Sequence, residues 1–152
     1  MFRLFLAVAL TAIALPALAE SIKINEPYAR LNPHAKTGAV FLEVINMTDT
    51  DDRLIGVATE VAAKAELHTH IENDQGVMMM RQVEDGFAVP AGSSHMLMRG
   101  GDHIMLMGLS GDLSDGDTID LILTFERAGA MPLSVTFDNA RKPRSTGMNH
   151  DH

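Results

Sequence analysis

Apolar residues along most of the chain alternate with polar residues or stand in short runs, which is typical of β-strands. Gly, Pro, Asn and Asp residues separate these runs, and no long stretch keeps a helical period. Such residues favour the tight turns that join antiparallel strands. The pattern predicts strands at residues 22–30, 38–46, 53–59, 64–71, 76–83, 95–99, 103–109, 118–127 and 133–137.

This number of short strands predicts an all-β sandwich or barrel. The chain has 152 residues, and 46% of them are hydrophobic, which is enough for one domain with its own core. There is no internal repeat and no room for a second domain. We therefore expect a single β domain over residues 20–138.

The first residues have the pattern of a secretory signal peptide. Arg3 precedes an apolar stretch at residues 4–15, and Ala17-Leu18-Ala19 provides the small residues of a cleavage site. We expect cleavage after Ala19, so that residues 1–19 are removed. No second apolar run of membrane length follows, and there is no cysteine for lipid attachment. The sequence therefore predicts an exported protein that is not inserted in the membrane after cleavage.

Charge and cysteine content narrow the possible functions. The chain carries 20 acidic and 12 basic residues, a net charge of −8, which disfavours nucleic acid as a partner. The absence of cysteine means that packing must hold the fold without disulfides. It also removes the thiolate ligand of a blue-copper electron-transfer site. No nucleophile–base motif is recognisable, so we do not expect an enzyme.

Histidine and methionine are concentrated between positions 68 and 109, in a chain that has 11 methionines and no cysteine. A thioether is a neutral, polarizable ligand, and Cu(I) accepts it readily alongside neutral imidazole, whereas hard cations do not. This region therefore points to a copper site that favours the reduced ion.

Strand periodicity groups these donors, because residues two apart lie on the same face. His68 and His70 share a face of one predicted strand, and His103 and Met105 share a face of another. The His-x-Met pair forms half of a site. The other half would come from His68 and from the methionines at positions 78–80.

The chain resembles the PCu(A)C family of periplasmic copper(I) chaperones in six segments that span most of the predicted domain: PYARLNP, TGAVFLEVINMTDTDDRLIGV, KAELHTH, GVMMMRQV, VPAG and GGDHIMLMGL. The resemblance implies a cupredoxin-like Greek-key β-barrel or sandwich. It implies Cu(I) ligation by His68, Met80, His103 and Met105. It also implies delivery of the ion in the periplasm to an acceptor of cytochrome c oxidase assembly, a Sco-type protein or oxidase subunit II.

The spacing departs from the family signature, which has ten residues between the first histidine and the methionine and then twenty-one before His-x-Met. Here eleven residues separate His68 from Met80, and twenty-two separate Met80 from His103. We expect the two extra residues in turns, at positions 72–75 and 84–87, where insertions are tolerated. Counting ten residues from His68 selects Met79 instead. We prefer Met80, because GVMMMR aligns through its arginine and because Met79 lies on the opposite strand face.

The other histidines and methionines have simpler interpretations. Met47, Met107 and Met131 are expected to fill space in the core, and Met96 and Met98 are also more readily explained by packing than by a role near the metal. His34 and His95 are expected to be exposed or satisfied polar residues, and Asp102 is expected in a turn. For His70, ligation and a supporting or surface role are equally consistent with the sequence.

Residues 139–152, NARKPRSTGMNHDH, lose the apolar content of the rest of the chain. We expect a flexible extension. Its Met148, His150 and His152 could bind metal, and the two histidines with Asp151 suit Cu(II), a harder ion than Cu(I). An extension that binds copper no better than any peptide with two histidines is equally consistent with this composition.

Two functions other than delivery remain open. A copper-scavenging or resistance protein would use the same ligands as a chaperone. A metal-free interaction sandwich would use the methionines only for packing. A redox-cycling copper enzyme is disfavoured because such sites are normally richer in histidine.

Overall fold

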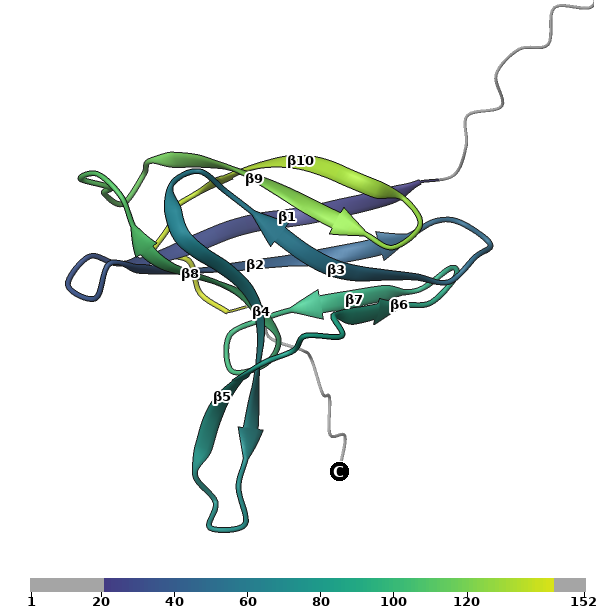
Figure 1. Ribbon diagram of the computed structural model, residues 1–152, viewed down its shortest axis with the longest axis horizontal. Coiled ribbons are helices and arrows are strands. Elements are labelled where there is room, and N and C mark those ends of the chain that lie inside the picture. Colours follow the sequence, from purple (N-terminus) through teal and green to yellow (C-terminus); the bar gives the residue numbers. More distant parts are fainter. Residues whose placement is uncertain (1–20, 144–152) are drawn as a thin grey trace, which may run out of the picture.

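The computed structural model describes residues 21–143, and this part of the chain is a sandwich of two antiparallel β-sheets without any helix (Figure 1). The predicted all-β class is confirmed. The strands are β1 (Ile22–Asn32), β2 (Thr37–Asn46), β3 (Asp52–Ala58), β4 (Ala62–Glu72), β5 (Met78–Gln82), β6 (Phe87–Val89), β7 (Ser94–Leu97), β8 (His103–Leu109), β9 (Thr118–Phe125) and β10 (Gly129–Thr136).

The first sheet has the order β1-β2-β8-β4-β5, with β7 also paired to β2, and the second has the order β10-β9-β3-β6. Hairpins join β1 to β2, β4 to β5 and β9 to β10, whereas the β2–β8 and β3–β9 pairs bring together strands distant in sequence. Neither sheet closes on itself. The fold is therefore a cupredoxin-like sandwich with an open sheet.

The core lies between the two sheets and follows the alternation of the strands. Ile104 and Leu106 of β8 are fully buried on one side, and Leu121 and Leu123 of β9 are buried on the other. Alternate residues of each strand point away from this core, because side chains of a strand alternate between its faces. His103 and Met105 therefore lie on the outer face of the first sheet.

The structure contains one strand that the sequence pattern did not predict, β6 (Phe87–Val89), and begins the last strand at Gly129 rather than at residue 133. Three residues are too few for alternation to be recognised. Pro132 made the start of β10 resemble a loop, but β10 is an edge strand, where a residue without a backbone N–H is tolerated.

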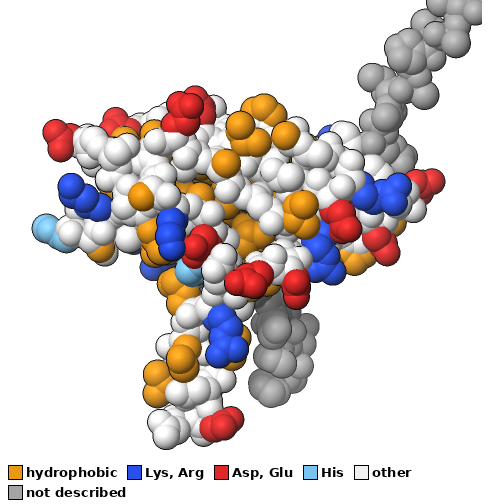
Figure 2. Space-filling view, viewed as in Figure 1, with side chains coloured by type: hydrophobic (Ala, Val, Ile, Leu, Met, Phe, Trp, Pro, Cys, Tyr) orange, Lys and Arg blue, Asp and Glu red, His pale blue; other side chains and the backbone are white. Residues whose placement is uncertain are grey.

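The β4–β5 hairpin projects from the body of the sandwich (Figure 1). All of β5 is exposed. Figure 2 shows hydrophobic side chains on the surface of this projection. The exposed large hydrophobic residues of the hairpin are Ile71, Val77, Met78, Met79 and Met80. The hairpin therefore presents thioethers to solvent next to the outer face of β8.

The chain after β10 remains in contact with the domain as far as it is described. The Asn139 side chain accepts a hydrogen bond from the Leu31 backbone N–H at 2.7 Å and donates one to the Leu31 carbonyl at 3.0 Å. The Arg141 guanidinium lies 4.6 Å from the centre of the Tyr28 ring. These contacts attach the start of the segment predicted as an extension to β1.

The predicted signal peptide at residues 1–19 and the donors Met148, His150 and His152 lie outside the described residues. Over residues 21–143, no helix could span a membrane.

Candidate metal site

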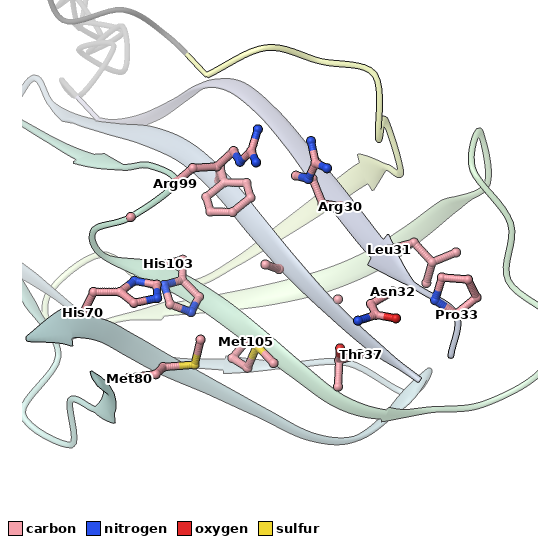
Figure 3. Close-up of a pocket in the computed structure, with 14 residues that line it drawn as sticks. Arg30, Leu31, Asn32, Pro33, Thr37, His70, Met80, Arg99, His103 and Met105 are labelled. Carbon is pink, nitrogen blue, oxygen red and sulfur yellow. The ribbon is translucent and has the colours of Figure 1, made fainter. Parts of the chain in front are cut away.

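A cavity of about 470 Å³ opens on the outer face of the first sheet and contains imidazole and thioether side chains from three strands (Figure 3). The strands are β4, β5 and β8, and the far wall comes from β1 and β2. The side chains in the cavity that could bind a soft metal ion are those of His70, Met80, His103 and Met105. In Figure 3 the two imidazole rings lie side by side, with both thioethers next to them.

Strand register brings these donors together. In the β4–β5 ladder, His70 is directly opposite Met80, and in the β4–β8 ladder, His68 is directly opposite His103. Met105 follows His103 on the same face of β8. Residues directly opposite in antiparallel strands point to the same side of the sheet, so all five side chains share its outer face.

His103 is the most buried of these donors, with 2% of its surface exposed. Its Nδ1 lies 3.0 Å from the carbonyl oxygen of Gly101. A carbonyl can only accept, so Nδ1 carries the proton and Nε2 keeps a lone pair. Desolvation by burial, reinforced by the nearby His70 and His68, lowers the pKa of His103 below 6.5. The ring is therefore neutral at pH 7 and ready to bind a metal through Nε2.

His70 uses the same carbonyl. Its Nδ1 lies 3.2 Å from the Gly101 oxygen, and its ring centre is 5.1 Å from that of His103. The proton is again fixed on Nδ1 when the ring is neutral, which leaves Nε2 as the donor atom. The Gly101 carbonyl oxygen therefore orients both imidazoles so that Nε2 of each is free to bind a metal ion.

His68 lies close to His103 but does not line the cavity. Its Nε2 is 2.9 Å from a carboxylate oxygen of Glu66, and its ring centre is 5.9 Å from that of His103. The Nδ1 atom is buried without a hydrogen-bond partner. Buried nitrogens are nearly always paired, so this atom has a free bonding capacity that a metal ion could use.

The two thioethers come from different environments. Met80 is 46% exposed on β5, while Met105 is partly buried on β8. Met79 is opposite Ile71 in the β4–β5 ladder and therefore lies on the other face of the hairpin. Of the two methionines that the spacing allowed, Met80 is the one that lines the cavity.

The structure thus brings Met80, His103 and Met105 into one cavity, places His68 beside His103, and adds His70. The register explains the position of His70. Glu72 pairs with Met78, so five residues, Asn73 to Val77, form the hairpin loop. A loop one residue shorter would place His70 opposite Met79, because a one-residue slip moves every side chain to the other face. Loop length was the signal that could have identified His70.

The chemistry of the donors suits a soft ion. Within residues 21–143, no group of three or more His, Cys, Asp or Glu side chains could hold a metal ion. The donors gathered here are instead imidazoles and thioethers, and such donors bind Cu(I) well and hard cations poorly when the imidazoles are neutral. Arg30 and Arg99 also line the cavity, and they would further disfavour a multiply charged cation.

Several other histidines and methionines of the described chain lie outside the cavity, among them the exposed His34. His95 is 2.8 Å from Asp102 through its Nε2 and stacks on Phe87, so it is a satisfied polar residue. Of the three methionines predicted to pack in the core, Met131 does so, whereas Met107 is only partly buried outside it and Met47 is 41% exposed. Met96 and Met98 line a separate cavity.

Comparison with known proteins gives a consistent family assignment. Residues 22–137 match the model of the LpqE-like family, described as "Putative lipoprotein LpqE-like". A protein of Leifsonia xyli subsp. xyli, described as "Putative lipoprotein Lxx21020", is 30% identical over 131 residues, which cover 82% of this chain and 78% of the relative.

Solved structures share the fold. The copper-bound PCuAC domain from PmoF2 is 24% identical, with a TM-score of 0.64, over 80% of this chain and 96% of that chain. The Cu(I) form of DR1885 from Deinococcus radiodurans is 27% identical, with a TM-score of 0.58, over 85% of this chain and 83% of that chain. Since the family model spans most of the described residues, the chain belongs to the LpqE-like family, which is the PCu(A)C family.

Proposed function

We propose that this protein is a copper chaperone that binds Cu(I) and passes it to an acceptor. The observation that carries the proposal is the meeting of two thioethers and neutral imidazoles in one open cavity. The copper-bound state of PmoF2 and the Cu(I) state of DR1885, which have the same fold, support copper as the cargo. A carrier of this kind is not an enzyme, since the ion leaves in the oxidation state in which it arrived.

The ligand set that we propose is His68, Met80, His103 and Met105. Three of these side chains line the cavity, and the fourth has a buried nitrogen without a partner next to His103. None of the four donors carries charge when the imidazoles are neutral. Such a set stabilises Cu(I) over Cu(II), and Met80 on the exposed hairpin leaves one side open to an acceptor.

We further propose that the protein works after export, in the periplasm, following cleavage behind Ala19. The signal-like N-terminus supports export, as does the description of the relative as a lipoprotein. The acceptor that we propose is a protein of cytochrome c oxidase assembly, of the Sco type or oxidase subunit II. Thiolate ligands in such an acceptor would bind Cu(I) more strongly than thioethers and would draw the ion forward.

A mixing experiment separates delivery from storage. The copper-loaded protein is mixed with an apo acceptor that carries a pair of cysteines, and the two proteins are separated and assayed for copper. A chaperone gives its ion to the acceptor within the mixing time. A scavenging protein retains it, and an interaction domain without a metal function contains no stoichiometric copper to transfer.

We also propose that the last residues of the chain form a weaker Cu(II) site through His150 and His152. Nitrogen donors with a neighbouring carboxylate, Asp151, suit the harder ion. Deletion of residues 146–152 should abolish Cu(II) uptake while Cu(I) binding to the domain persists. Unchanged Cu(II) uptake after the deletion would show that the segment has no such role.

A further inference from the structure

Resting on the proposed function, we propose that His70 is an exchange ligand, which holds Cu(I) at the mouth of the cavity and alternates with His68 as the ion enters and leaves. His68 and His70 each have a ring contact with His103. The proposed resting site uses only two of them. His70 is the third, and it lines the open cavity, whereas His68 does not.

The Gly101 carbonyl prepares His70 for this role. Because the same oxygen accepts from Nδ1 of His70 and from Nδ1 of His103, both neutral rings present Nε2 as the free donor. A surface histidine without such a hydrogen bond would populate both neutral tautomers and several rotamers. A histidine whose second nitrogen is held by a backbone carbonyl is the arrangement found around metal-binding imidazoles.

The position of His70 in the sheet gives it access to incoming copper. It is directly opposite Met80, so the hairpin presents one nitrogen and one sulfur donor on the same side. Met80 is 46% exposed, and the cavity that both side chains line is open to solvent. By contrast, the free nitrogen of His68 is buried. An ion that approaches from outside meets His70 and Met80 before it meets His68.

The ring separations allow one ion to be shared. At the metal–imidazole distance of about 2.0–2.1 Å, two rings on the same ion have centres about 5–6 Å apart. The separation from His103 is 5.1 Å for His70 and 5.9 Å for His68. Both separations lie within the range for two imidazoles that share one ion.

The exchange conserves charge and oxidation state. The bond from Cu(I) to Nε2 of His70 breaks as the bond to Nδ1 of His68 forms, and the sequence reverses on release. When both imidazoles are neutral, their protons lie on the nitrogens that face Gly101 and Glu66, so no proton needs to leave. The ion moves from a position open to an acceptor to a position protected by burial.

The test compares His70→Ala and His70→Gln with His68→Ala, using His34→Ala at an exposed histidine outside the cavity as the matched control. Cu(I) affinity is measured under reducing conditions by competition with a chromophoric chelator. The rate of transfer to the chelator is measured by stopped flow. Both His70 variants should transfer copper about tenfold more slowly, equivalent to about 1.4 kcal/mol of barrier. Their affinity should stay close to that of the unmodified protein, while His68→Ala should lose affinity.

A second readout does not depend on transfer. In His68→Ala, the ion should remain at the mouth of the cavity, so the 15N resonance of His70 Nε2 should shift when Cu(I) is added. Unchanged transfer rates in both His70 variants would overturn the proposal, as would an unshifted His70 resonance in copper-loaded His68→Ala. If the unmodified protein bound no Cu(I) at all, the proposed function itself would fail, which is a different result from either of these.

Discussion

The two faces of β8 differ in what their residues do. On the inner face, Ile104 and Leu106 are fully buried between the sheets and contribute only packing. On the outer face, His103 and Met105 line a cavity with donors from two other strands. Because a strand alternates its side chains, one seven-residue segment carries both sets. Stability and copper binding should therefore respond to different substitutions in the same strand.

The largest expected effect is on the inner face. Leu106→Ala should lower the free energy of unfolding by about 2–5 kcal/mol, because it removes buried methyl groups and leaves a cavity. Met107→Ala, one residue further on and outside the core, should cost less than about 1 kcal/mol. Urea denaturation measures both. Equal losses in the two variants would mean that the faces are not divided as described.

On the outer face, His103→Ala should reduce Cu(I) affinity about a hundredfold, equivalent to about 2.7 kcal/mol of binding free energy. Its matched control is His95→Ala, which removes a histidine that is bonded to Asp102 and does not line the cavity. Competition with a chelator gives both affinities. If a His68→Ala, His103→Ala double variant still bound Cu(I) tightly, the copper site could not be on this face of the sheet.

The same contrast between faces can be tested with Met80 and Met79, two neighbouring methionines of β5. Met80→Ala should weaken Cu(I) binding about tenfold, or about 1.4 kcal/mol, because it removes a soft donor from the cavity. Met79→Ala should leave affinity unchanged, because Met79 is on the other face of the hairpin. The two side chains have similar exposure, so the pair controls for general effects on the hairpin. The reverse order of effects would identify Met79 as the ligand.

A smaller effect is expected from acid on the apo protein. Burial lowers the folded-state pKa of His103 below 6.5; the hydrogen bond to Gly101 and the charge of Asp102 oppose this shift, and His70 and His68 add to it. The unfolded chain therefore takes up a proton on this residue before the folded chain does. The stability that neutral His103 allows should be fully present above pH 6.5. The free energy of unfolding should then fall as the pH drops from 6.5 through the folded-state pKa of His103. Thermal melts between pH 7.5 and about 5 measure it.

In the melts, His103→Gln serves as the control, since it cannot titrate. The Tm of the unmodified protein should fall further than that of this variant over the same pH range. Parallel melting curves for the two proteins would show that His103 does not contribute to the pH dependence.

Alternation in the sequence was sufficient to predict the β class, most strands and the shared face of His103 and Met105. It could not identify β6, because three residues do not establish a period, and it began β10 late because of Pro132. At the site, residue spacing predicts which donors share a strand face. It does not predict which residues of neighbouring strands stand opposite each other.

That second property depends on the hairpin loop. The five-residue connection between Glu72 and Met78 sets His70 against Met80 and brings His70 into the cavity. The sequence indicates a turn at Asn73 to Gly76, but it does not show whether Val77 belongs to the loop or to the next strand. The sequence is equally consistent with ligation and with a supporting or surface role for His70, and the hydrogen bond to Gly101 is visible only in the folded structure.

The most direct test of copper binding by the outer face is a Cu(I) titration of the protein under reducing conditions, read by X-ray absorption. The proposed site predicts one tightly bound Cu(I) in the folded domain, with both nitrogen and sulfur among the atoms bonded to it, because His68 and His103 supply imidazoles and Met80 and Met105 supply thioethers. A first shell of nitrogen and oxygen without sulfur, or the absence of stoichiometric Cu(I) binding by the folded chain, would contradict it.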